Sequence, residues 1–335
     1  MKKQLYRLIM SFITLLILSN CSTITKLDKT EAAESKIKVI KDLDLYSVSS
    51  VEYIDPDREF FHVSLSETLP PDADKKILPA NLTQKKYTII GNKRKLFMKL
   101  AGIPEAAYVR IYDYTNNQLF SYPISSMEVT AILDIFKYDL TPPYETTNYR
   151  IGFELPQALW SMLRSNSGLI VYITKDNPFA QKQLTPLDWQ IIPNANYPHT
   201  GADQLSNRDD GNASKVIKSY LAKANNMTFY VQDYVDESQP ERLGIDKILA
   251  RELLVLDDEG NTLFKRRMFQ DEGTSLVELN NFHEDGNDQF QWAGQLFKDL
   301  PPVVFGFESF AFGCGGVDFI VPDAEGIEFK CDNRH

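Results

Sequence analysis

The fold class is decided by residues 253–264, which read Leu-Leu-Val-Leu-Asp-Asp-Glu-Gly-Asn-Thr-Leu-Phe. Apolar residues flank a centre of Asp, Gly and Asn, the residue types that favour tight turns between antiparallel strands, so the stretch predicts a β-hairpin. Similar short runs rich in Val, Ile, Tyr and Phe recur between turn residues along most of the chain. They predict strands at residues 37–40, 59–65, 87–90, 96–100, 108–112, 119–123, 149–154, 169–174, 228–234, 251–256, 263–268 and 303–312.

Helical patterns are fewer. Asn212 is a good N-cap for apolar residues that continue at helical spacing to Leu221. Residues 156–165 also place apolar side chains on one helical face, residues 125–136 begin with a capping-box pattern, and residues 289–300 are a further candidate. We therefore predict a mainly β fold with a few helices, a β-rich α+β class.

The length predicts two domains. At roughly 100–200 residues per domain, 335 residues suffice for two hydrophobic cores. Asn, Gly, Asp, Ser and Pro replace the apolar pattern at residues 193–212, which predicts a linker. We expect two tandem β-sandwich-like domains, at residues 37–192 and 213–335.

A faint internal repeat supports two related domains. Residues 111–120 and 255–264 share an apolar pair followed by Asp, a later Asn, and Leu-Phe. Further along, Gly-Phe-Glu occurs at both 152–154 and 306–308. A third pair follows in the same order, in which residues 168–173 resemble residues 316–321. The order predicts an internal duplication with a shared strand order.

The amino terminus has the layout of an export signal. Three basic residues, Lys2, Lys3 and Arg7, lie near the start, and an apolar run follows from Leu8 to Leu18. This run is shorter than the roughly 20 residues of a membrane-spanning helix and has the size of a signal-peptide core. The sequence Leu-Ser-Asn-Cys at residues 18–21 resembles the lipobox of bacterial lipoproteins. The resemblance implies a signal peptide cleaved after residue 20 and lipid on Cys21; an ordinary cleaved signal with an incidental Cys is the alternative.

The residues after Cys21 indicate location and partners. Ser22 stands where an Asp would signal retention at the inner membrane, so the resemblance to Gram-negative lipoproteins implies an outer-membrane lipid anchor facing the periplasm or the cell surface. Residues 21–36 form the lipidated Cys and a flexible tether. Loss of residues 1–20 lowers the formal charge from −10 to −13. Such an acidic body disfavours nucleic acid and anionic lipid as close partners. Its charge would steer a basic partner toward it, and a soluble acidic surface without a partner is the alternative.

Two cysteines remain for the body, Cys314 and Cys331. Two apolar runs between them flank the turn residues 322–326, so a strand-turn-strand arrangement brings the thiols together. An even pair in an oxidising compartment predicts a disulfide. A zinc site is the alternative, although two cysteines without a nearby His supply only half of its ligands.

Catalytic signatures are missing from the sequence. It contains no nucleophile-elbow, phosphate-loop, dinucleotide-binding or zinc-protease motif. His62 lies in an apolar run and is expected to be a packed strand residue, while a Ser-His-Asp arrangement assembled in space stays open. The acidic stretches 206–212 and 283–288 do not follow the calcium-loop pattern and are expected to be solvated turns. We assign no catalytic residue, no metal and no cofactor.

Two functional hypotheses follow. The first is an envelope lipoprotein that binds a partner protein, as an inhibitory, immunity-like module or as an assembly factor. The second is an envelope hydrolase with paired carboxylates as general acid and base. A deep cleft with two close carboxylates of raised pKa would favour the hydrolase, and a surface without such a pair would favour the binding protein.

Overall fold

The computed structural model describes residues 40, 43–51, 60–137, 140–160, 163, 168–198, 214–236, 244–282, 289–311, 313–322 and 326–332. The predicted signal peptide and tether, residues 1–36, lie outside these residues. The chain divides into two units between Leu43 and Asp44, and the unit from Asp44 onward carries the features below. This unit is mainly β, with antiparallel sheets of sandwich type, which confirms the predicted β-rich α+β class.

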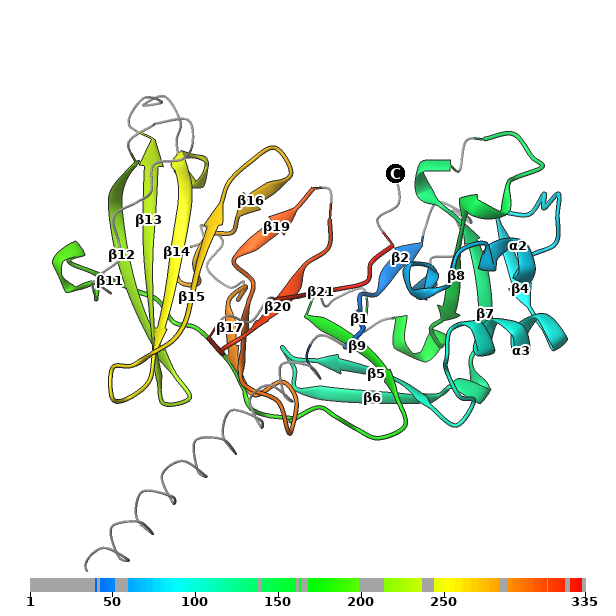
Figure 1. Ribbon diagram of the computed structural model, residues 1–335, viewed down its shortest axis with the longest axis horizontal. Helices are drawn as coiled ribbons and strands as arrows, with labels where there is room; N and C mark the ends of the chain where they lie inside the picture. Colours follow the sequence, from blue (N-terminus) through cyan, green and yellow to red (C-terminus); the bar gives the residue numbers. More distant parts are fainter. Residues whose placement is uncertain are drawn as a thin grey trace, which may run out of the picture. The chain divides into compact units, whose positions relative to one another are not determined.

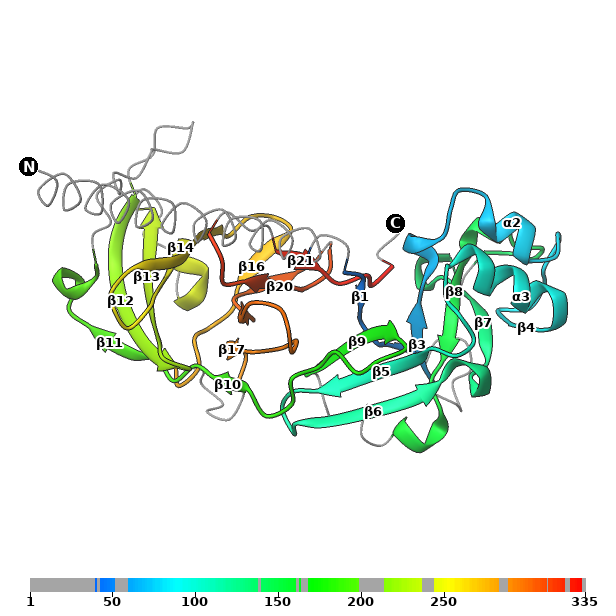
Figure 2. The ribbon, with the colours of Figure 1, turned by 60° about the horizontal axis from the view of Figure 1, so that its bottom comes forward.

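Two antiparallel sheets form the part of this unit before residue 175. One has the order β1-β9-β5-β6 and the other the order β2-β3-β8-β7-β4 (Figures 1 and 2). Every residue of β3 and β7 is buried, so the second sheet is covered on both faces there. The strands are β1 (Leu45–Tyr46), β2 (Ser49–Val51), β3 (Phe60–Ser64), β4 (Lys86–Ile89), β5 (Tyr108–Asp113), β6 (Gln118–Pro123), β7 (Val129–Leu133), β8 (Tyr149–Glu154) and β9 (Leu169–Thr174).

Helix α3 (Gly91–Leu100) occupies a region where residues 96–100 were predicted as a strand, so that prediction is wrong. Phe97 and Met98 are buried and lie one turn after Arg94, which is the spacing of a helix face. The Phe97 ring packs edge-on against Phe153 of β8, with ring centroids 5.8 Å apart. The short helix α2 (Ala73–Ile77) contacts α3.

The second half contains a five-stranded meander, β11-β12-β13-β14-β15, a five-stranded sheet, β10-β17-β18-β20-β21, and the pair β16-β19 (Figure 1). The hairpin predicted at residues 253–264 is confirmed, because β14 and β15 pair and the Asp257 carboxylate accepts the Asn261 N–H at 2.8 Å. The strands are β10 (Leu184–Pro186), β11 (Gln190–Ile192), β12 (Ser214–Ala224), β13 (Met227–Asp236), β14 (Ile248–Leu256), β15 (Thr262–Phe269), β16 (Thr274–Leu276), β17 (Trp292–Gly294), β18 (Val303–Phe305), β19 (Glu308–Phe310), β20 (Gly316–Phe319) and β21 (Ile327–Glu328).

Three helix predictions are wrong. The helix expected from Asn212 is strand β12, which pairs with β11 and β13 on its two edges. Residues 125–136 contain strand β7, and residues 289–300 contain strand β17. In each case pairing with neighbouring strands outweighs the local signal. The described part of residues 156–165 does contain helical turns, and the 3-10 helices are η1 (Ser66–Thr68), η2 (Ile124–Ser126), η3 (Ile135–Lys137), η4 (Thr146–Asn148), η5 (Gln157–Leu159), η6 (Asn194–Asn196) and η7 (Gly244–Lys247).

Two large hydrophobic cores divide the unit, one built by residues 46–171 and the other by residues 187–320. Strands β10 and β11 precede the predicted linker at 193–212, yet they pair with β17 and β12 of the second half. Aromatic stacking also joins the segment before the predicted linker to the second half: the rings of Phe179 and Phe297 stack with their centroids 5.3 Å apart. Since residues 199–213 lie outside the described residues, the domain boundary stays a prediction.

The repeated segments do not share a strand order. Residues 111–120 and 255–264 both form hairpins, β5–β6 and β14–β15. However, β9 pairs with β5, whereas β20 pairs with β18 and β21 and not with β14. The predicted duplication is therefore wrong, and the likeness reflects turn chemistry that the two hairpins share.

Candidate functional site

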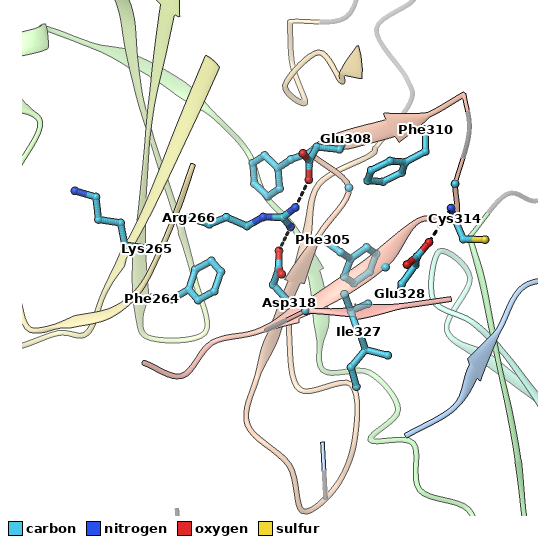
Figure 3. A pocket seen from close by; sticks show the side chains of 16 residues that line it. Phe264, Lys265, Arg266, Phe305, Glu308, Phe310, Cys314, Asp318, Ile327 and Glu328 are labelled. Atoms are coloured by element: carbon cyan, nitrogen blue, oxygen red, sulfur yellow. Dashed lines mark hydrogen bonds and ion pairs between the residues drawn. The ribbon is translucent and has the colours of Figure 1, made fainter. Parts of the chain in front are cut away.

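A cleft of about 540 Å³ opens between edge strand β15 and the strands β18, β19, β20 and β21 (Figure 3). Four phenylalanines and three acidic residues are among the sixteen residues that line it. Its lining residues include Phe264, Arg266, Phe305, Phe307, Glu308, Phe310, Asp318, Ile327 and Glu328. Because these residues come from five strands, the cleft forms only when the second half of the chain has folded.

An arginine between two carboxylates forms the polar centre of the cleft. The Arg266 guanidinium donates to Glu308 through one terminal nitrogen and to Asp318 through the other (Figure 3). The two carboxylate side chains are each 10% exposed, and the Arg266 side chain is 38% exposed. We call these three residues the Arg266 triad. The cation is shared, so the triad retains one formal negative charge.

The strands explain how the triad assembles. In β15, Phe264, Arg266 and Met268 alternate with outward-facing residues, and the neighbours of Arg266 on that face are buried in the second core. Asp318 lies in β20, opposite Val304 of β18. Glu308 begins β19, directly after a break in the predicted strand 303–312.

Gly306 makes this break. Its φ of +90° lies in the region that glycine prefers, and a Cβ there would stand 1.9 Å from the Phe290 carbonyl oxygen. The chain therefore turns sharply between β18 and β19. The turn lets Glu308 face Arg266.

Burial raises the pKa of both triad carboxylates. For Glu308 and Asp318 alike, desolvation is the largest cause of the rise, and it outweighs the opposing effect of the Arg266 charge. Asp318 raises the pKa of Glu308 further through like-charge repulsion. The charge of one guanidinium thus offsets only part of the cost of desolvating the two carboxylates.

The remaining wall of the cleft is acidic and aromatic. Glu328 is exposed on β21, and its carboxylate accepts the Cys314 N–H at 3.3 Å. Lys265 also borders the cleft, but its side chain points away from the triad and pairs with Glu252 at 3.4 Å (Figure 3). In this view the Phe305 ring lies between Glu328 and Asp318, and the Phe310 ring lies beside Glu308. Negative charge therefore dominates beside an aromatic surface.

A disulfide closes one end of the cleft. The structure joins Cys314 and Cys331, with Cα atoms 5.8 Å apart, across the predicted strand-turn-strand arrangement of β20 and β21. Immediately before Cys331 the chain reaches the first half, where the Lys330 N–H donates to the Leu45 carbonyl and the Ser47 N–H donates to the Lys330 carbonyl. The third predicted site residue, Cys21, lies outside the described residues. Among the residues that are described, no group of three metal-ligating side chains occurs.

A second polar cluster lies inside the first core. The Ser64 hydroxyl donates to Asp332, and His62 lies on the same strand as Ser64. All three residues are buried, at 5%, 1% and 0% exposure for Ser64, Asp332 and His62. Within the described residues neither ring nitrogen of His62 makes a well-formed hydrogen bond. The three residues therefore form no catalytic triad, because Ser64 is not bonded to the ring and substrate has no access; the packed strand position expected for His62 is confirmed.

We expect His62 to make stability pH-dependent. Burial lowers its pKa from 6.5 to about 4, so the folded ring stays neutral while the unfolded ring binds a proton. Stability is therefore lost as the pH falls below 6.5 toward 4, by about 2 kcal/mol between roughly pH 7 and pH 5. Urea unfolding of the wild type and of His62→Leu at both pH values measures this loss. The difference between their pH dependences isolates the histidine, and equal slopes would contradict the assignment.

The sequence did not single out the triad. Asp318 stood inside an apolar run and Glu308 followed a Gly-Phe pair, which are the local signals that could have marked them. Arg266 carried no signal, because it lies in a run of three basic residues on an exposed edge strand.

No helix in the described part of the chain is both long and apolar enough to cross a membrane. No family model, no curated protein and no solved structure matches the chain.

Proposed function

We propose that this chain is a lipid-anchored protein of the bacterial envelope whose cleft binds a basic side chain of a partner protein, as a protein-binding or inhibitory module. The observation that carries the proposal is the Arg266 triad, in which two buried carboxylates share one guanidinium.

The electrostatics favour a cationic guest. Glu308 and Asp318 have raised pKa values because one shared cation leaves their desolvation incompletely compensated. A lysine or arginine that enters the cleft brings a second positive charge to carboxylates that are already desolvated. Such charge-assisted contacts are stronger than those between neutral groups. The exposed carboxylate of Glu328 extends the acidic surface of the cleft.

The aromatic lining suits the same guest. Phe305 and Phe310 present rings beside the carboxylates (Figure 3). A cation within about 6 Å of a ring face gains roughly 0.5–2 kcal/mol, and the methylene groups of a basic side chain pack on the same rings. The acidic net charge of the chain supports the proposal further, since it accelerates the encounter with a basic partner.

The hydrolase remains the second candidate, favoured by one observation. The cleft does hold two close carboxylates of raised pKa, the arrangement expected for a general acid and base. However, Arg266 pairs with both of them. A substrate atom placed between the carboxylates would have to displace the guanidinium. The triad therefore supports recognition better than proton transfer.

A pull-down from native membranes distinguishes the two candidates. The bait is the full chain, compared with Glu328→Gln in the cleft and with Glu128→Gln, an exposed carboxylate outside it. We expect Glu328→Gln to reduce recovery of a basic partner about tenfold and Glu128→Gln to leave it unchanged. Equal recovery with both variants would contradict the binding proposal. Turnover of envelope polysaccharide or peptide that Glu308→Gln abolishes would establish the hydrolase.

The anchor has its own test. We expect the chain to incorporate labelled palmitate in a Gram-negative host, and Cys21→Ala to lose the label completely, because Cys21 is the residue that the lipobox resemblance marks for lipid. Cys314→Ser/Cys331→Ser is the matched control and should keep the label. Labelling that persists in Cys21→Ala would overturn the anchor and leave the cleft proposal standing.

A further inference from the structure

The net charge conceals a local excess of the opposite sign. Residues 75–104 contain eight basic residues and no acidic residue, so the rest of the chain carries a formal charge of −18. Seven of these basic residues belong to α2, β4 and α3, and the eighth, Lys85, directly precedes β4. The two helices contact each other and lie next to each other in Figure 2. A chain that is acidic overall thus concentrates positive charge on one short segment.

The exposed members of this segment form one surface. We define the α2–α3 patch as Lys75, Lys76, Lys93, Lys95 and Lys99, all of which are exposed, together with Ile90. The Lys93 ammonium group donates to the Lys76 carbonyl, so the lysines of the two helices are neighbours. Lys75 pairs with exposed Asp72 at 2.6 Å. Among the described residues, the side chains of Lys76, Lys95 and Lys99 have no carboxylate partner.

The stability of the fold does not account for these lysines. Lys95 and Lys99 are four residues apart on α3, a spacing at which like charges repel and destabilise the helix. The first turn of α3 contains no acidic residue and carries Lys93, although the positive end of the helix dipole disfavours a cation there. Both features cost stability in the isolated protein. An anionic partner would remove both costs.

Ile90 identifies the kind of anionic partner. Its side chain is 71% exposed, the largest exposure among the large hydrophobic residues of the described part of the chain, and it directly precedes α3. A soluble polyanion has no apolar surface against which this isoleucine side chain can be buried. A bilayer with anionic headgroups offers phosphate to the lysines and acyl chains to the isoleucine.

We propose that the α2–α3 patch docks on anionic phospholipid, with Ile90 inserted between the headgroups. Each lysine near such a surface contributes about 1 kcal/mol, a factor of about five in binding. A protein that a lipid anchor already holds at the membrane would need only a few such contacts, because attachment raises the effective concentration of the surface. The patch is separate from the cleft, so it neither requires nor supports the cleft proposal.

Fluorescence in proteoliposomes tests the docking. The full chain with Ile90→Trp is reconstituted into vesicles of phosphatidylcholine and phosphatidylglycerol that contain brominated acyl chains, which quench tryptophans close to the hydrocarbon. We expect strong quenching of Trp fluorescence that disappears in pure phosphatidylcholine. Lys76→Gln/Lys95→Gln/Lys99→Gln in the same background should weaken docking by about two orders of magnitude. Ile191→Trp, at a 56% exposed position outside the patch, is the matched control.

Two results would overturn the proposal. One is quenching of Ile90→Trp no greater than that of Ile191→Trp. The other is quenching that the lysine substitutions leave unchanged. Self-association of the chain without lipid, abolished by the same three substitutions, would assign the patch to the acidic surface of a second copy instead. Asn92→Trp, also exposed, serves as the reporter if Ile90→Trp does not fold.

Discussion

Arg266→Met is expected to destabilise the protein by about 3 kcal/mol at neutral pH. The substitution removes the only cation of the triad and leaves Glu308 and Asp318 buried beside each other without compensation. Breaking a buried ion pair by removal of one partner costs about 3–5 kcal/mol, and the lower end applies because the Arg266 side chain is 38% exposed. Urea denaturation at equilibrium measures the loss.

The pH dependence gives this prediction a distinctive sign. Both carboxylates have pKa values above their ordinary range in the folded protein, and loss of the guanidinium raises them further. Their ionisation therefore destabilises the fold at neutral pH, and this cost disappears as protonation becomes complete toward about pH 4. We expect the effect of Arg266→Met to shrink over that range. In the background Glu308→Gln/Asp318→Asn it should fall below about 1 kcal/mol, and a full-size effect there would show that the arginine acts by packing alone.

Removal of the disulfide is expected to cost a similar amount. The bridge between Cys314 and Cys331 closes a sequence separation of 17 residues, for which the chain-entropy model predicts roughly 3 kcal/mol. It also holds the segment in which Lys330 bonds to Leu45 and Asp332 accepts the Ser64 hydroxyl. We therefore expect Cys314→Ser/Cys331→Ser to lower the free energy of unfolding and to speed amide exchange at Lys330.

Reductant supplies the control for this experiment. It should destabilise the wild type by the same amount as the double substitution and leave the variant unaffected. A loss of less than about 1 kcal/mol in both cases would mean that the contacts of the carboxyl-terminal segment hold it without the bridge.

The strands were predictable where turn chemistry and side-chain alternation agree. In the hairpin 253–264, Asp257 accepts hydrogen bonds from the Glu259 and Asn261 N–H groups, so the local sequence alone fixes the turn. The disulfide followed from the same reasoning, since β20 and β21 carry the two cysteines to one end of a hairpin. Local signals sufficed in both cases because the interacting residues are close in sequence.

The helix errors have the opposite cause. The segment after Asn212 has a capping residue and apolar spacing suited to a helix, yet β12 pairs with strands on both sides. Those partners are decided by the sheet as a whole. For α3, residues 96–100 were predicted as a strand because the first half of the helix is polar, so the apolar residues are too few to show the helical repeat.

The triad was beyond sequence reasoning for a related reason. Arg266 is 42 residues from Glu308 and 52 from Asp318, and only the packing of β15 against β19 and β20 brings them together. The α2–α3 patch was not predicted for a similar reason. The net charge of −10 is a sum over the whole chain and does not reveal that residues 75–104 contain no acidic residue. Both features depend on where charges lie, which composition does not record.

Zero-length crosslinking tests the central claim most directly. A carbodiimide joins a carboxylate to an amine only when the two groups touch, so treatment of native membranes that contain the full chain reports which carboxylates meet a partner lysine. We predict that mass spectrometry of the crosslinked peptides finds partner lysines coupled to Glu328, Glu308 or Asp318, and that Glu328→Gln depletes these peptides. Crosslinks confined to carboxylates outside the cleft, such as Glu128, would contradict the claim that the cleft is the binding site.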